Sequence, residues 1–156
     1  MFDILLPLDL DASILEPSAG QGAIIQNAIE YGCVSKEQFD CIEIHPLNRA
    51  ALEEQGLNLI AENFNEFQTD KRYDSCYANP PFKEILSHTL KISEILKKNG
   101  SAVIVVPSSF KDKYEKQIAE LEEQYEYVGF YEVPNGSFKE LGTMVNCDIL
   151  HLSYKL

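Results

Sequence analysis

The chain alternates short apolar runs with segments of helical period from one end to the other. SAVIVV at residues 101–106 is a continuous, largely β-branched run of the kind that forms strands buried on both faces. GAIIQNAIEY at residues 22–31 repeats apolar residues every three or four positions, as an amphipathic helix does. The two patterns predict strands over 13–16, 39–44, 57–61, 73–78, 101–106, 127–133 and 143–154, and helices over 22–31, 46–55, 82–98 and 112–125.

The order of these elements predicts the fold class. Strands and helices alternate until the last two strands, which follow one another without a helix between them. Such an order is typical of an α/β fold with a doubly wound, mostly parallel sheet that helices cover on both faces. The last two strands should form a hairpin, with the final strand antiparallel. Because no linker or repeat interrupts the pattern, residues 1–156 are expected to form a single domain.

Charge and cysteine content narrow the function classes. The chain has 13 basic and 25 acidic residues, a net charge of −12, so its average field repels nucleic acid. The N-terminus carries acids where a signal peptide would carry basic residues, and no apolar stretch of about 18 residues is present. These features predict a cytoplasmic protein without a membrane segment. The four cysteines lack the close-spaced pairs of zinc sites, so we expect reduced thiols and no metal.

Candidate chemistry begins at EPSAGQG, which connects the first predicted strand to its helix. Gly20 and Gly22 would let a ligand approach the backbone closely, and the helix start offers N–H groups. Ile25 stands where the phosphate-binding pattern G-x-G-x-x-G has its third glycine. The acid Glu16 before the turn therefore favours a ligand with a positive ammonium group over a pyrophosphate.

Two further strand ends carry polar groups. Glu43, near the end of the second predicted strand, could accept hydrogen bonds from both hydroxyls of a ribose. The tetrapeptide NPPF, from Asn79 to Phe82, follows the fourth strand. Its prolines fix the backbone, so the Asn79 amide and a nearby carbonyl could accept both protons of an –NH2 group, while Phe82 offers a ring for a planar base.

Together these motifs resemble the class I S-adenosylmethionine (SAM) dependent methyltransferases, and within them the N6-adenine DNA methyltransferases known from restriction–modification systems. EPSAGQG is similar to that family's first SAM motif, and NPPF to its catalytic (D/N/S)PP(Y/F/W) tetrapeptide. The segment 134–155 looks like the family's late loop and terminal hairpin, so the resemblance spans nearly the whole chain. It implies a Rossmann-like sheet of seven strands in the order 3-2-1-4-5-7-6, the last strand antiparallel, and SAM as the cofactor.

The resemblance also implies roles for individual residues. The residues expected to line the amino-acid end of SAM are Glu16, Pro17, Ala19, Gly20 and Gly22. Glu43 would hold the ribose, and Asn63-Phe64, where the family usually has Asp-Phe, would contact the adenine of SAM. Asn79 and the Pro80 carbonyl would hold the target amine. Pro81, Phe82 and Phe138 would bind the target base, with Phe82 stacking on it. His45, His88 and His151 show no ligand spacing and are expected to be structural or surface residues.

The leading hypothesis from the sequence is an enzyme that methylates the N6 amine of adenine in DNA. Three alternatives remain open: an enzyme acting on RNA bases, one acting on a protein glutamine, and a non-catalytic subunit of a larger assembly. Only 15 residues precede Glu16 and no target-recognition domain follows the last strand, so a partner chain or a second copy is expected to supply recognition. By itself, the chain should bind DNA weakly and without sequence preference.

Overall fold

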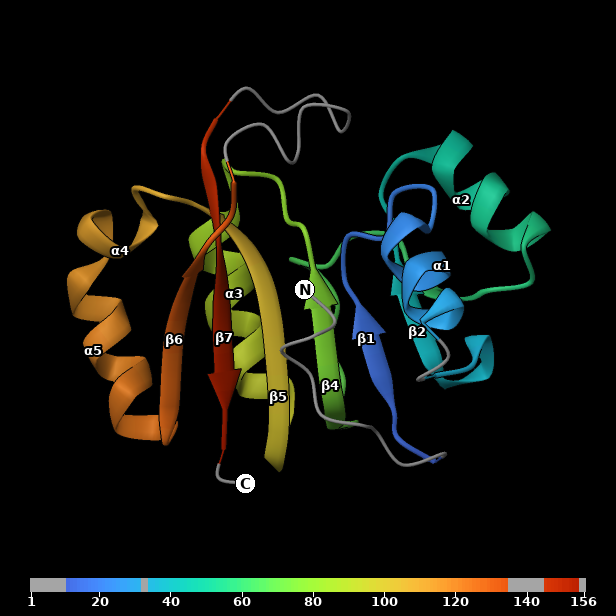
Figure 1. Cartoon of the computed structure of the whole chain (residues 1–156). Helices are drawn as coiled ribbons and strands as arrows, with labels where there is room; N and C mark the ends of the chain where they lie inside the picture. Colours follow the sequence, from blue (N-terminus) through green and yellow to red (C-terminus); the bar gives the residue numbers. More distant parts are fainter. Residues whose placement is uncertain (1–10, 32–33, 135–144, 155–156) are drawn as a thin grey trace.

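The described strands form one sheet with the predicted topology. The computed structural model describes residues 11–31, 34–134 and 145–154. The strands are β1 (Ile14–Glu16), β2 (Phe39–Ile42), β3 (Asn58–Ala61), β4 (Tyr73–Ala78), β5 (Leu96–Pro107), β6 (Tyr127–Glu132) and β7 (Cys147–Ser153). They lie side by side in the order β3-β2-β1-β4-β5-β7-β6 (Figure 1). Every neighbouring pair from β3 to β5 is parallel, and β7 is antiparallel to β5 and β6, which confirms the predicted sheet.

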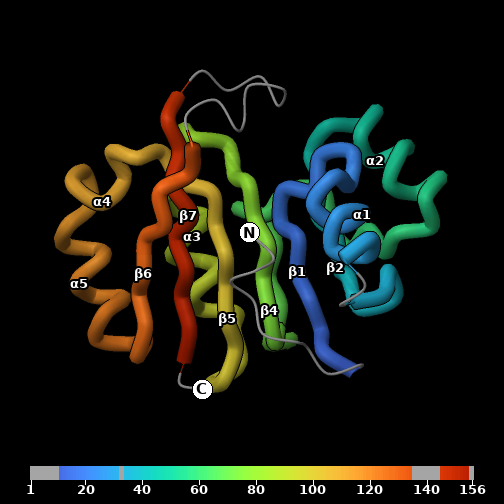
Figure 2. The backbone as a smooth tube through the Cα atoms, viewed as in Figure 1, coloured from blue at the N-terminus to red at the C-terminus, as the bar shows by residue number. Residues whose placement is uncertain are grey.

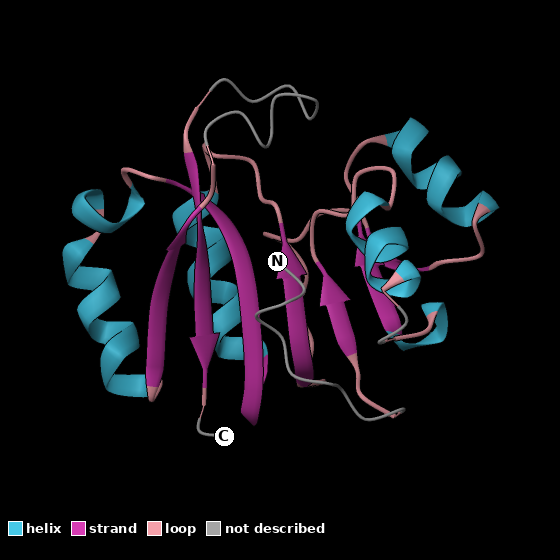
Figure 3. Cartoon of the chain, viewed as in Figure 1, coloured by secondary structure: helices cyan, strands magenta, loops and turns pink. Residues whose placement is uncertain are grey.

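Helices cover both faces of this sheet (Figure 3). The helical elements are α1 (Ala23–Glu30), the 3-10 turn η2 (Lys36–Gln38), α2 (Pro46–Glu54), α3 (Ile85–Ile95), α4 (Phe110–Lys113) and α5 (Glu115–Gln124). Ile25 of α1 and Leu52 of α2 belong to one apolar core with residues of β1, β2 and β5. Ile92 of α3 and Leu121 of α5 belong to the other, on the opposite face. The fold is therefore doubly wound, as the alternation of strands and helices predicts.

The predicted helix over 82–98 is wrong at both ends, because α3 runs only from Ile85 to Ile95. Leu96 takes extended backbone angles and pairs with Tyr73 of β4. Gly100 does not act as a helix cap, because its φ is not positive. A Cβ on Gly100 would lie 2.9 Å from the Tyr73 carbonyl oxygen, so glycine is needed there for the close approach of two strands.

The helix predicted over 112–125 is also two elements instead of one. Helix α4 already begins at Phe110, whose side chain is buried, and the chain bends at Tyr114, with φ −125° and ψ 36°, before α5 begins. The Tyr114 ring lies 4.9 Å from the Phe110 ring. Phe110 belongs to the apolar core and Tyr114 packs against it half-buried, so both aromatic residues lie on the core side at the bend.

Other sequence expectations agree with the structure where it describes the residues. Cys41, Cys76 and Cys147 are free and buried, as predicted, and Cys33 lies outside the described residues. The final strand is shorter than predicted, beginning at Cys147. In the described part of the chain, no helix combines the length and the apolar character that crossing a bilayer requires.

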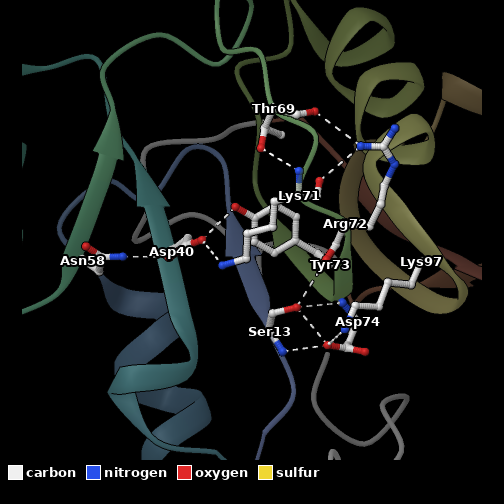
Figure 4. Close-up of polar contacts among 9 residues, drawn as sticks. All are labelled: Ser13, Asp40, Asn58, Thr69, Lys71, Arg72, Tyr73, Asp74 and Lys97. Atoms are coloured by element: carbon white, nitrogen blue, oxygen red, sulfur yellow. Dashed lines mark hydrogen bonds and ion pairs between the residues drawn. The ribbon is translucent and has the colours of Figure 1, made fainter.

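A polar cluster centred on the buried Asp40 joins β2, β3 and β4 at their amino ends (Figure 4). Asp40 accepts hydrogen bonds from the Tyr73 hydroxyl at 2.8 Å, the Lys71 ammonium at 2.6 Å and the Asn58 amide at 2.8 Å. Burial alone would raise the pKa of Asp40, but these three donors outweigh it and hold the pKa below the usual value. A neighbouring ion pair joins Lys97 of β5 to Asp74 of β4 at 2.7 Å.

Replacing Tyr73 by phenylalanine should destabilise the fold by about 1–3 kcal/mol, because a buried charged acceptor loses a donor. Asp40 has a lowered pKa, so its contribution is complete above its unfolded pKa of 3.8 and is lost as the pH falls through the lower folded value. The difference between variant and wild type should therefore shrink in strong acid. Urea unfolding at pH 7 and at pH 2–3 measures it. Tyr127→Phe, at an exposed Tyr127–Tyr131 pair, is the control and should change stability by less than about 0.5 kcal/mol.

Candidate active site

The carboxyl ends of β1, β2 and β4 meet at one edge of the sheet, since these strands are parallel neighbours. Figure 2 shows the chain leaving β1 and β4 at this same edge. A pocket of about 340 Å³ opens here, within the size range of small-molecule sites. Its lining residues are Pro17, Ser18, Glu43, Ile44, Glu62, Asn63, Phe64, Asn79, Pro80, Pro81, Phe82, Glu84 and His88.

The turn after β1 is built on two glycines with left-handed backbone. Gly20 has φ 55° and Gly22, which caps α1, has φ 87°. A Cβ on Gly22 would lie 3.1 Å from the Leu52 side chain, so Gly22 allows α1 to pack closely against α2. A Cβ on Gly20 would have no atom within 4 Å, so the outer side of this residue is open. Ala19 is buried, and its N–H donates to the Ile42 carbonyl at 3.0 Å.

Glu43 ties this turn to the end of β2. One of its oxygens accepts the Gly20 N–H at 2.7 Å, and the other accepts the His45 N–H at 2.7 Å and the Asn48 amide at 3.4 Å. The carboxylate is buried, with 7% exposure, yet it lines the pocket. The oxygen that accepts only the Gly20 N–H has a further lone pair, so Glu43 can still accept a hydroxyl donor from a ligand.

Glu16 lies behind the pocket wall, with 1% exposure, and does not line the pocket itself. One of its oxygens accepts the Ser18 N–H at 3.3 Å, whereas the other is buried without a hydrogen-bond partner among the described residues. Burial raises the pKa of Glu16 to about 8; the Ser18 N–H opposes the rise and the nearby Glu43 charge adds to it. A buried carboxyl with an unpaired oxygen is suited to a cationic ligand group.

The NPPF tetrapeptide follows β4 and forms another wall. Asn79 is half-buried, Pro80 is buried and Pro81 is exposed. Phe82 is half-buried and packs against the core on the α1 and α2 face. Helix α3 begins three residues later, which anchors the segment at both ends. All four residues line the pocket, as expected from their position after a central strand.

Asn63 and Phe64, after β3, complete the wall near Glu43. The Asn63 side-chain oxygen accepts the Asn65 N–H at 3.0 Å, and its amide donates to Glu66 at 2.9 Å. Phe64 is buried, and its ring makes an edge contact with the His88 ring at a centroid distance of 5.0 Å. The amide of Asn63 is therefore engaged within its own turn.

The structure gathers most of the predicted site residues around this pocket. Phe138 lies outside the described residues. Five lining residues were not predicted from the sequence: Ser18, Ile44, Glu62, Glu84 and His88. Ile44 is 64% exposed at the pocket, where it could form an apolar wall. Its position as an apolar residue directly after Glu43 is the sequence signal that could have indicated this role. His88, expected to be structural or on the surface, is buried in the pocket wall.

No protein-family model and no curated protein matches this sequence. Solved structures do match its fold. An rRNA methylase from Streptococcus thermophilus has a TM-score of 0.67 and 15% identity, over 96% of this chain and 90% of that one. A dimethyladenosine transferase from Plasmodium falciparum has a TM-score of 0.68 and 17% identity, over 95% and 57%. The M protein of the Type I restriction enzyme EcoKI has a TM-score of 0.68 and 16% identity, over 94% and 40%.

The last two neighbours are much longer than this chain, which covers 57% and 40% of them. At identities of 15–17%, the likeness concerns the fold. The sheet order β3-β2-β1-β4-β5-β7-β6 with antiparallel β7 matches the expectation drawn from EPSAGQG and NPPF. The chain has the Rossmann-like fold of the methyltransferases.

Proposed function

We propose that this protein is a SAM-dependent methyltransferase that modifies the N6 amine of adenine in a nucleic acid. The observation that carries the proposal is the meeting of two groups of residues at one pocket. Glu43 and the turn after β1 form one group, and the Asn79–Phe82 tetrapeptide forms the other. A cofactor and a target amine bound to these groups would be neighbours, as methyl transfer requires.

The residues present fit the parts of SAM. The unpaired oxygen of Glu16 lies behind the pocket wall, from where its charge would attract the ammonium group, and the open side of Gly20 leaves room for the methionine chain. Glu43 would accept a ribose hydroxyl, while Phe64 and the exposed Ile44 would contact the adenine ring. When bound, SAM supplies a methyl group on a sulfonium, so the chain itself needs no covalent intermediate.

The tetrapeptide would activate the target. The lone pair of an adenine N6 amine is delocalised into the ring, which makes the amine a poor nucleophile. The Asn79 amide oxygen and the Pro80 carbonyl would accept the two amine protons and stabilise positive charge as the new N–C bond forms. Among the described residues none is hydrogen-bonded to the Asn79 side chain, so this amide is available to a substrate. Phe82 would hold the base by stacking.

DNA is the first substrate that we propose, because NPPF and the late segment 134–155 resemble the DNA enzymes. RNA is the second candidate, and two observations favour it. Two of the similar folds belong to an rRNA methylase and a 23S rRNA methyltransferase, ErmE. In addition, a net charge of −12 opposes the phosphate contacts that duplex binding and base flipping usually use, whereas a single-stranded adenine is already accessible.

Transfer of tritiated methyl groups from SAM to duplex DNA, single-stranded DNA, RNA and protein, offered in parallel, tests the proposal. Digestion of the labelled product should identify N6-methyladenine. Label in glutamine would reassign the substrate to protein. No transfer to any acceptor, with SAM still bound, would support a non-catalytic subunit and refute the proposed activity.

Phe82→Ala should weaken binding of the target base and leave SAM affinity nearly unchanged. Base stacking on an aromatic ring contributes about 1–3 kcal/mol, so KM for the nucleic acid should rise about 5- to 150-fold. Phe82→Tyr keeps the ring and serves as the control. Because Phe82 also packs against the core, the melting temperature of each variant must be compared with that of the wild type. Equal KM values for a folded Phe82→Ala and the wild type would remove Phe82 from the target site.

A further inference from the structure

Asn63 occupies the position where the sequence resemblance places an acid, and its contacts limit what it can accept. Its side-chain oxygen is used by the Asn65 N–H at 3.0 Å and its nitrogen by Glu66 at 2.9 Å. The Asn63 oxygen, which accepts the Asn65 N–H, keeps one lone pair, whereas the carboxylate expected at this position would offer two oxygens. The amino group of an adenine bound beside Phe64 has two protons, so a second acceptor in the pocket would satisfy the proton that Asn63 does not.

His88 supplies a buried acceptor in the same pocket wall. The side chain is 4% exposed, and its Nδ1 has no hydrogen-bond partner in the described part of the chain. Its Nε2 lies 3.3 Å from a carboxylate oxygen of Glu84, which makes Nε2 the nitrogen that carries the proton. Nδ1 then presents a lone pair. The Phe64 ring fixes the imidazole from another side, at 5.0 Å.

The protonation state supports the same assignment. Burial lowers the pKa of His88, and the nearby Glu84 only partly opposes this effect. The imidazole is therefore neutral at pH 7, with one nitrogen protonated. A neutral, buried, unpaired nitrogen in a ligand pocket is costly unless a ligand completes its hydrogen bond.

We infer that His88 Nδ1 accepts a hydrogen bond from the 6-amino group of the cofactor's adenine and so makes the site selective for a 6-aminopurine. The inference rests on the proposed function. A 6-oxopurine would place a carbonyl oxygen against the nitrogen lone pair, so two acceptors would oppose each other. His88 thus supplies an acceptor for the amine in addition to the single lone pair that the Asn63 oxygen keeps.

The test compares binding of S-adenosylhomocysteine and its 6-oxo analogue, S-inosylhomocysteine, by calorimetry. The wild type should prefer the 6-amino ligand about 10- to 100-fold. His88→Phe should reduce this preference to a few-fold, mainly by weakening S-adenosylhomocysteine. His88→Asn, whose side-chain oxygen lies close to the position of Nδ1, should keep most of the preference. His88→Gln places its oxygen nearer Nε2 and should lose it, which provides a second test if His88→Phe does not fold.

His151 provides a matched control, because its Nδ1 is also buried and unpaired but lies on β7, away from the pocket lining. His151→Phe should leave the preference unchanged. Equal binding of both ligands to the wild type, or full preference in a folded His88→Phe, would overturn the role of His88 and leave SAM binding intact. If neither ligand binds the wild type, the proposed function itself fails, and the role of His88 with it.

Discussion

Replacing Asn79 by alanine should lower the rate of methyl transfer about 100- to 1000-fold while leaving SAM affinity nearly intact. The loss corresponds to removing one preorganised acceptor that acts on the reacting amine. Asn79 lines the pocket from the end of β4, whereas the groups proposed to hold SAM follow β1, β2 and β3, together with His88 on α3. Single-turnover transfer of tritiated methyl groups measures the rate, and calorimetry with S-adenosylhomocysteine measures cofactor binding.

Two further variants make this prediction specific. Asn79→Asp keeps an acceptor oxygen at the same place and should retain more activity than Asn79→Ala. Asn27→Ala, on the exposed side of α1, removes the same amide at a residue that does not line the pocket and should retain wild-type activity. If Asn79→Ala is as active as Asn27→Ala on every substrate, the tetrapeptide does not hold the target amine.

Glu16→Gln should change the pH dependence of the free energy of unfolding of the ligand-free protein. The pKa of Glu16 is about 8 in the fold and 4.5 as the reference value, so the folded protein binds more protons than the unfolded chain between these pH values. This contribution is fully present below pH 4.5 and is lost as the pH rises to about 8. Glutamine has no proton to lose. Relative to the wild type, the variant should therefore gain stability with rising pH, at a slope of up to about 1.4 kcal/mol per pH unit.

Denaturant unfolding at pH 5 and at pH 8 measures the difference in free energy of unfolding between Glu16→Gln and the wild type. From pH 5 to pH 8 this difference should shift by a few kcal/mol in favour of Glu16→Gln. Glu53→Gln, exposed on α2, is the control and should follow the wild-type profile. A constant difference between Glu16→Gln and the wild type at both pH values would show that Glu16 is ionised in the fold.

The same substitution should weaken SAM binding, because the proposed partner of the ammonium group loses its charge. In the wild type, binding at pH 7 should release a proton from Glu16, since a neighbouring cation favours the carboxylate. Calorimetry in buffers of different ionisation enthalpy counts that proton. Glu16 thus destabilises the protein without its ligand and contributes to binding, a conflict typical of functional sites.

The sequence by itself determined the order of the elements and the strand ends at which polar residues gather. A run such as SAVIVV and a helical repeat such as residues 22–31 are local patterns, so they predict β5 and α1 without knowledge of their neighbours. Parallel strands separated by helices must bring their carboxyl ends to one edge, which placed Glu43 and Asn79 at the same pocket.

Only the tertiary structure decided the features that depend on contacts between distant segments. Helix α3 ends at Ile95, and not at the predicted residue 98, because Leu96 pairs with Tyr73 of β4. Glu43 is engaged by the Gly20 N–H, and His88 lies in the pocket wall against Phe64. The raised pKa of Glu16 arises from complete burial, which no local pattern shows. Burial and hydrogen-bond partners are properties of the packed chain, because each depends on residues that the sequence separates and the fold brings together.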